Sequence, residues 1–533
     1  MREILRVETA KTAAGHIARI RKEMFFMMSS LYIGATGLKS HGEGLSVVTN
    51  NLANVNTVGF KQHSMQYMDM VSQFVAADSN ALTNMSQLGA GSSTGSVRTL
   101  FTAGGVEKGS EATDLCIDGG GFFGVTKNGQ THYTRAGNFR FTKTGELLDP
   151  TGWNVLGHAI TNGVEASATT PIVLDSSSTG VSFMPAKATT NVVSCSMLGG
   201  LEEKNRSADN PFFRMTASWD GTASTPLAEG DYGYSEPFEF YDSNGELRQA
   251  AIYYDLAGKS GGNTAVEYLV AFDPAMDASG RAGTEAAGLL MAGTITFDST
   301  GEMINLTAFT PPDSGSPADL SGWNPASLSA AGYPAFTVHP AGNDESPAVA
   351  QDIALNMGLS LSGTSSAGLA SAADAAGDAE TIYSAGESVT LNSTASVNFG
   401  ESCAGIVSKK DGYSEGMLTE VTVGEDGVIT GRYTNGETND LYRINLYRFV
   451  SQDGLINEGS NHYSATEESG EAQEGVAGTK NFGTMAQYAL EGSNVDYARE
   501  FSLMIVTQRG FQMNSKVVTT SDEMLRKALE IKR

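Results

Sequence analysis

The chain has 533 residues, a formal net charge of −26, 40% apolar residues and 18% charged residues. This length exceeds what one hydrophobic core supports, so we expect several globular domains. The negative charge argues against nucleic acid and anionic membranes as partners. No stretch approaches the ~20 apolar residues that cross a bilayer, so we expect no membrane insertion.

Residues 1–26 differ in composition from the rest of the chain. They hold six basic residues against three acidic ones. They have neither the apolar core nor the small-residue cleavage site of a secretory signal peptide. Met27 and Met28 directly precede a regular helical pattern. We therefore expect the natural start there and interpret residues 1–26 as a non-native N-terminal extension.

Residues 27–60 carry a helical pattern in which a leucine recurs every seven positions. The pattern predicts a helix from Met28 to about Val58. The repeating residues are Leu31, Leu38, Leu45 and Leu52. Small residues between these leucines allow another helix to approach closely but lower the intrinsic helicity, so the helix needs neighbours.

Residues 489–533 carry a second helical pattern, which predicts a helix from about Asn494 to Ile531. Its apolar seam consists of Phe501, Met504, Phe511, Val518, Leu525 and Leu529. Two such seams at opposite ends of the chain predict that the termini pack together or against other copies. This layout is typical of an assembling subunit rather than an enzyme.

Polar residues interrupt both helical patterns. Asn50, Asn51 and Asn54 cluster at the end of the first helix, although asparagine favours caps and turns. A helix end explains part of this cluster, but we favour amides that hydrogen-bond between helices and fix their register. In the second helix Gln508, Ser515 and Asp522 either serve the same role or face water.

The sequence between the helices predicts strands and turns. Residues 61–95 are polar and weakly periodic, as in a linker. Residues 96–165 and 405–488 predict the two parts of a middle β-domain, including a hairpin turn at Asn128-Gly129.

Residues 166–404 predict one or more outer β-domains with an insertion. The low-complexity stretch Ser360–Asp378 is expected to be an exposed loop or the edge of an inserted domain. The fold class is thus α+β, with mostly β middle and outer domains. A terminal coiled-coil core is formed by the N- and C-terminal helices.

The sequence holds no set of residues typical of catalysis. Cys116, Cys195 and Cys403 lie far apart without a CxxC pair, and the seven histidines are dispersed. The glycines at 119–121 lead into a strand rather than a helix, which is unsuited to a phosphate. We therefore predict no catalytic residue, no metal site and no cofactor.

Several sequence blocks resemble those of a known family. These are Ser46–Lys61, Asp118–Phe123 with Tyr133–Phe139, and Leu490–Asp496 with Gln508–Gln512. They are similar to blocks shared by the bacterial flagellar axial proteins, meaning rod and hook subunits. The blocks Tyr241–Gly245 and Ile295–Gly301 resemble the outer domain of hook members, which rod subunits lack.

The resemblance implies a homopolymeric, curved and flexible tube that connects the rod to the filament and transmits torque. It also implies partners: distal rod, hook cap and hook–filament junction proteins, and the flagellar type III export apparatus. The subunit would then lie outside the cell, exported without a cleaved signal peptide.

Two alternatives remain open from the sequence. A distal rod subunit or another axial protein belongs to the same class, although the length and the outer-domain blocks count against it. A secreted β-rich adhesin or surface enzyme would share the strand-rich middle, but it would not need paired terminal heptads.

Overall fold

The computed structural model divides the chain into two compact units. Unit 1 comprises Met1–Ser182, Leu418–Arg432 and Thr438–Arg533, and unit 2 comprises Phe183–Met417 and Tyr433–Glu437. The structure describes residues 2–71, 73–76, 85–161, 163–174, 183–204, 211–342, 349–363, 367–386 and 389–530.

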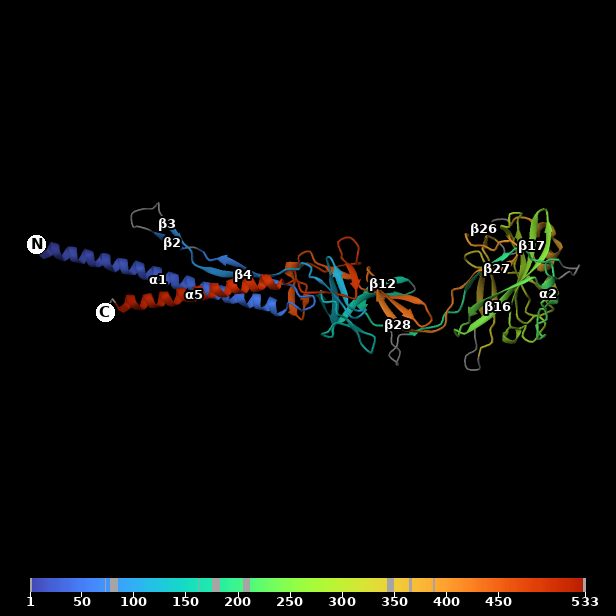
Figure 1. The fold of residues 1–533 in the computed structure, drawn as a ribbon, viewed down its shortest axis with the longest axis horizontal. Helices are drawn as coiled ribbons and strands as arrows, with labels where there is room; N and C mark the ends of the chain where they lie inside the picture. Colours follow the sequence, from blue (N-terminus) through green and yellow to red (C-terminus); the bar gives the residue numbers. More distant parts are fainter. Residues whose placement is uncertain are drawn as a thin grey trace. The chain divides into compact units, whose positions relative to one another are not determined.

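The terminal helices of unit 1 are α1 (Arg2–Ala53) and α5 (Tyr497–Glu530), which lie side by side (Figure 1). The helix α5 begins three residues after the predicted start near Asn494, because Asp496 Oδ1 accepts hydrogen bonds from the backbone amides of Ala498 and Arg499, at 2.9 and 3.1 Å.

The helix α1 begins earlier and ends earlier than the predicted range of Met28 to Val58. Its end follows from asparagine chemistry, since Asn54 Nδ2 donates to the backbone oxygen of Asn50 at 2.9 Å. The chain then turns through Gly59, which has a φ of +70°. A Cβ at Gly59 would lie 2.5 Å from the backbone nitrogen of Ala136, so this turn requires glycine.

Residues 61–95, expected to form a linker, contain paired strands. The strands β1 (His63–Asp69) and β4 (Ser92–Thr99) are antiparallel, as are β2 (Gln73–Ala76) and β3 (Met85–Leu88). The β1–β4 pair packs on α1, where Ser40 Oγ donates to the backbone oxygen of Ser92 at 3.1 Å. The weak periodicity reflects strands that are covered on one side by a helix.

The β-domain of unit 1 is assembled from two distant parts of the chain. The first part supplies β5 (Val106–Lys108), β6 (Leu115–Asp118), β7 (Phe122–Lys127), β8 (Gln130–Thr134), β9 (Arg140–Phe141), β10 (Leu147–Leu148), β11 (Asn154–Thr161) and β12 (Val164–Pro171). The second part supplies β29 (Val428–Tyr433), β30 (Thr438–Arg443), β31 (Leu446–Arg448), β32 (Ile456–Gly459), β33 (His462–Ser464), β34 (Gln473–Gly475), β35 (Thr484–Gln487) and β36 (Ala489–Glu491).

The two parts interlock strand by strand. The cross-pairs are β11 with β30, β7 with β31, β8 with β33, β6 with β35 and β5 with β36. Asn128 and Gly129 join β7 and β8 with positive φ angles of 53° and 80°, as the predicted hairpin turn requires. Phe123, Val155 and Leu446 share one buried core.

Unit 2 is built around two packed sheets. One has the order β22 (Ser327–Leu328), β23 (Pro334–Val338), β24 (Gln351–Asn356), β14 (Asn191–Leu198) and β27 (Cys403–Lys410). The other has the order β15 (Tyr234–Tyr241), β16 (Leu247–Ser260), β17 (Asn263–Phe272), β18 (Leu289–Phe297), β20 (Phe309–Thr310) and β21 (Asn324–Pro325), with β19 (Met303–Leu306) beside β18. Smaller strands of unit 2 are β13 (Phe183–Met184), β25 (Leu359–Leu361) and β26 (Val389–Leu391). The strand β28 (Gly416–Val423) belongs to unit 1 from Leu418 onward, where it lies beside β29.

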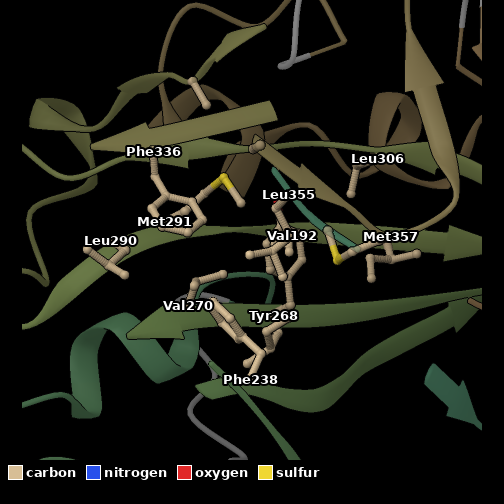
Figure 2. Packing of buried hydrophobic residues seen from close by; sticks show 14 of the residues in the cluster. Val192, Phe238, Tyr268, Val270, Leu290, Met291, Leu306, Phe336, Leu355 and Met357 are labelled. Carbon is tan, nitrogen blue, oxygen red and sulfur yellow. The ribbon is translucent and has the colours of Figure 1, made fainter. Parts of the chain in front are cut away.

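Apolar side chains fill the layer between these sheets. Figure 2 shows Phe336 and Leu355 from one sheet packed with Val270 and Met291 from the other. The far face of the larger sheet carries a second core, covered by α2 (Arg214–Ser218), α3 (Ala372–Gly377) and α4 (Ala379–Tyr383). The described residues between 305 and 405 therefore contribute to this sandwich and to the helices that cover it.

The stretch Ser360–Asp378 was expected to be an exposed loop or the edge of an inserted domain, and the loop alternative is wrong for its second half. The helix α3 lies there, with Ala372 and Ala375 fully buried. Alanine is apolar and small enough for close packing, so a low-complexity Ala/Ser/Gly sequence can still cover a sheet.

Candidate assembly surface and helix–domain junction

The contact between α1 and α5 is made by small and polar residues. Ser30 Oγ and Ser521 Oγ lie 3.1 Å apart, and Asn51 Nδ2 donates to Glu500 Oε2 at 3.2 Å. Between these two contacts, Gly37 packs against the side chain of Asn514. Each step of seven along α1 matches a step of seven back along α5, so the helices are antiparallel with a heptad register.

The predicted leucines lie one position to the side of this seam. Leu31, Leu38, Leu45 and Leu52 are all half-buried, whereas Gly34, Gly37 and Asn51 are buried. On α5 the buried residues Glu500, Thr507 and Ser521 are likewise one position before Phe501, Gln508 and Asp522. The polar residues proposed for register, Gln508 and Asp522, are exposed, and Ser515 is half-buried.

The three clustered asparagines have different roles. Asn51 is buried and bonds to α5. Its side chain also binds the backbone of His63: Asn51 Nδ2 donates to the His63 oxygen at 2.7 Å, and Asn51 Oδ1 accepts from the His63 N–H at 2.9 Å. The described bonds of Asn54 stay within α1 and the turn after it. Asn50 and Asn54 line a cavity of about 430 Å³ beside Asp149 and His462.

Many large apolar side chains of α5 are exposed, although Val517 and Val518 lie against Gly34 of α1. Among the predicted residues, Phe501, Phe511 and Leu529 are exposed, and Met504, Val518 and Leu525 are half-buried. We call the exposed residues the apolar set of α5: Tyr497, Phe501, Leu503, Ile505, Val506, Phe511, Met513, Val517, Met524 and Leu529. The helix α1 adds Phe25, Phe26, Met28 and Tyr32, which are also exposed. Exposed apolar surface of this extent marks an interaction site.

A buried polar network joins the helices to the β-domain. The side-chain Nε2 of Gln62 donates to Glu500 Oε1 at 2.5 Å, and the backbone N–H of Gln62 donates to Asn494 Oδ1 at 2.7 Å. Asn494 in turn donates to the backbone oxygens of Leu100 and Thr102. The segment after α1 and the segment before α5 are thus held to each other and to the chain entering the β-domain.

An ion cluster lies next to this network. Glu491 accepts from Lys61 Nζ at 2.6 Å and from Arg135 Nη1 at 3.3 Å, and all three side chains are almost fully buried. Burial lowers the pKa of Lys61 and of Arg135 from their ordinary values, and the charge of Glu491 opposes that effect. The neighbouring thiol of Cys116 is also buried, which raises its pKa to about 11.

Lys61, Arg135 and Glu491 were not among the functional residues predicted from the sequence. A signal was present, because each of them lies within one of the three blocks that resemble the axial proteins. The sequence could not show that these blocks meet at one buried point.

The described side chains do not bring together three His, Cys, Asp or Glu residues that could hold a metal ion. Within the part of the chain that the structure describes, no helix combines the length and apolar character needed to cross a membrane. Cys116 and Cys195 are buried and Cys403 is half-buried, and all three are free thiols.

Four family models match the chain in order. They describe a flagella basal body rod protein (residues 31–61), a flagellar hook protein FlgE/F/G D1 domain (116–186), a flagellar basal body protein FlaE D2 domain (209–413) and a flagellar basal body rod FlgEFG protein C-terminal region (486–531). The flagellar hook protein FlgE of Treponema pallidum is 27% identical and spans 95% of this chain and all of its own length. The chain belongs to the flagellar hook protein family.

Other relatives agree on the hook rather than the rod. The flagellar hook protein FlgE of Escherichia coli is 26% identical over 92% of this chain and 96% of its own length. The flagellar basal-body rod protein FlgG of Bacillus subtilis is 43% identical but covers 24% of this chain and 51% of its own length. This hook protein is therefore a structural subunit of the flagellar hook, and the rod alternative is not favoured.

A solved structure, that of the Helicobacter pylori flagellar hook protein FlgE2, is 14% identical, with a TM-score of 0.42, and covers 72% of this chain and all of that chain. The domain ranges drawn from the sequence, including the interpretation of residues 1–26, stay predictions.

Proposed function

We propose that this hook subunit polymerises into a tube through its terminal helices. The observation that carries the proposal is the inverted pattern of α5. Its polar heptad positions face α1 within the chain, whereas the side chains of its apolar set are exposed, although Phe511 and Val517 also border α1. In an ordinary surface helix the apolar stripe is turned inward. The exposed set on α5 is best explained by burial against other copies.

The energetics support assembly through these helices. Full burial of one large apolar side chain contributes about 1.5–3 kcal/mol, partly offset by the entropy lost when the chain is ordered. The exposed residues of α5 and α1 together form a large enough set to hold helices whose own seam is polar. Polymerisation would then stabilise the helices by mass action.

The charges of the two units also favour assembly through unit 1. Unit 2 contains 9 basic and 30 acidic residues, a net charge of −21 out of −26. Unit 1 contains 25 basic and 30 acidic residues and is nearly balanced. Close packing of many copies is opposed by like charge, so the nearly neutral unit 1 is the better candidate for the packed part. The acidic unit 2 would keep the assembly soluble.

We extend the proposal to partners and location on the basis of the family. The tube would join the distal rod at one end and a hook cap, later the junction proteins, at the other. The subunit would be exported by the flagellar type III apparatus without a cleaved signal peptide and act outside the cell. As a curved and flexible joint, the tube would pass torque from rod to filament.

The proposal is tested by charging the apolar set of α5. Val506 and Met513 are seven residues apart and 65% and 70% exposed, so Val506→Glu with Met513→Glu should leave the subunit folded. We expect this double variant to form no tubes in electron micrographs of basal bodies. Gln508→Glu is the matched control, since Gln508 is exposed and polar on the same helix. Normal hooks from the double variant would refute the proposal.

A further inference from the structure

One carboxylate connects four segments of unit 1 that are distant in sequence. Glu491 Oε1 accepts from Lys61 Nζ at 2.6 Å and from the amide of Gly104 at 2.9 Å. Glu491 Oε2 accepts from Arg135 Nη1 at 3.3 Å. Lys61 also donates to the backbone oxygen of Thr102 at 2.8 Å, so the segment after α1 is held by two contacts.

The positions of these residues make the cluster a joint. Lys61 follows the end of α1 by eight residues, and Glu491 precedes the start of α5 by six. Arg135 directly follows β8 and donates to the backbone oxygens of Ile117 (3.3 Å) and Gly119 (2.7 Å) in the β-domain. The bases of both helices and the adjoining β-domain therefore meet at the Glu491 side chain.

The charges in this joint are unequal. Two cations, Lys61 and Arg135, share one carboxylate, and the exposed fractions of the three side chains are 0%, 3% and 1%. The Arg135 guanidinium also lies 5.5 Å from the ring centre of Phe122. Removing one partner of a buried ion pair costs far more than the pair itself contributes, because a charge stays buried without compensation. Here, removal of the single anion would leave two such charges.

We propose that Glu491 is a positioning residue that latches the α1–α5 pair to the β-domain of unit 1 and so fixes the direction in which the helices leave it. The latch stands within one subunit and does not depend on polymerisation. Its consequence for the tube, that all copies present their helices at one angle, rests on the proposed function.

The thiols of the chain provide a direct readout of the latch. Cys116 lies on β6 beside the ion cluster and is 1% exposed, so a thiol reagent reaches it when the joint opens. Cys195 is fully buried in unit 2 and reports general unfolding. Cys403 is half-buried and serves as the reactive reference. Labelling of each cysteine in the monomeric full-length chain is followed by peptide mass spectrometry.

Glu491→Gln keeps the shape of the side chain and removes its charge. We expect Cys116 labelling to rise about tenfold or more while Cys195 labelling is unchanged, as for loss of one partner of a buried pair. Lys61→Met leaves one cation for one anion and should raise labelling less. The double variant should label more slowly than Glu491→Gln alone, because it buries one uncompensated cation instead of two.

Unchanged Cys116 labelling in Glu491→Gln would overturn the latch. A double variant that labels faster than Glu491→Gln would overturn the charge argument, since shape alone would then explain the effect. These measurements use monomers, so a latch that fails leaves the assembly proposal standing. If the charged α5 variant forms no tubes, that result likewise does not count against the latch.

Discussion

Asn51 on α1 and Glu500 on α5 meet through a hydrogen bond of 3.2 Å although 449 positions separate them in the sequence. The same asparagine holds both backbone groups of His63 on β1, and the same glutamate accepts from Gln62. Both side chains are buried. This pair therefore fixes the register of the two helices and the position of the strand that follows α1.

Asn51→Ala should destabilise unit 1 by roughly 2–4 kcal/mol, because it removes three hydrogen bonds and leaves buried backbone groups of His63 without partners. The amides of α1 and α5 should exchange with solvent faster in hydrogen-exchange measurements. Asn50→Ala is the control, because Asn50 is exposed and adjacent, and should change stability by less than about 0.5 kcal/mol. Equal effects of the two variants would contradict the assigned role of Asn51.

Two glycines of α1 should respond differently to alanine. A Cβ at Gly37 would lie 2.7 Å from Asn514 Oδ1, whereas the nearest atom to a Cβ at Gly42 is in the Phe511 ring at 3.8 Å. Gly42→Ala should stabilise α1 by up to about 1 kcal/mol through helix propensity. Gly37→Ala should fall short of that gain by about 1–2 kcal/mol, because Asn514 must move and give up its bond to the Gly510 oxygen.

Thermal unfolding followed by the helical circular dichroism signal measures both glycine variants against the parent protein. A gain for Gly37→Ala that equals that of Gly42→Ala would mean that the α1–α5 seam is loose at this position.

The sequence predicted the helices but placed the seam one position away. Hydrophobic periodicity detects apolar residues, so it found Leu45 and Phe501, which flank the contact. The contact itself is made mainly by glycine, serine and polar residues such as Asn514, which hydrophobic periodicity does not detect, although the predicted Val518 packs on Gly34. The shared period of seven was right, because both the seam and the leucines follow the geometry of the same helix.

Other successes and failures have equally local causes. The turn at Asn128-Gly129 was predictable because its positive φ angles restrict which residues fit. The burial of Ala372 was not predictable, because alanine-rich sequence is compatible with both loop and helix. The joint at Glu491 depends on the meeting of segments that only the tertiary fold brings together.

Replacing Leu45 and Leu52 with aspartate should block tube formation without unfolding the β-domains. Both leucines are half-buried beside the seam, and two added charges would oppose the packing of further helices there. Electron microscopy of basal bodies measures the outcome, and circular dichroism of the purified subunit checks the strands. Ser46→Asp, at an exposed position between them, should leave hooks normal. Unchanged hooks from the double variant would count against a packing role for these leucines.

Unit 2 should lose stability as the pH rises through the neutral range, because of Glu267. This residue is fully buried on β17, where burial raises the pKa of its carboxyl to about 8. Its oxygen accepts from the amide of Met215 at 2.8 Å, and the charges of Asp255 and Arg214 act on it in opposite directions.

The folded chain therefore binds this proton more tightly than the unfolded chain, and the stabilisation is complete below the ordinary glutamate pKa of about 4.3. It declines as the pH rises toward 8, by an amount on the order of a few kcal/mol. The urea midpoint, followed by fluorescence of the buried Trp219 and Trp323 of unit 2, should be higher at pH 5 than at pH 8.5. Glu267→Gln cannot ionise and should flatten this dependence, and a slope that persists in Glu267→Gln would assign it to other groups.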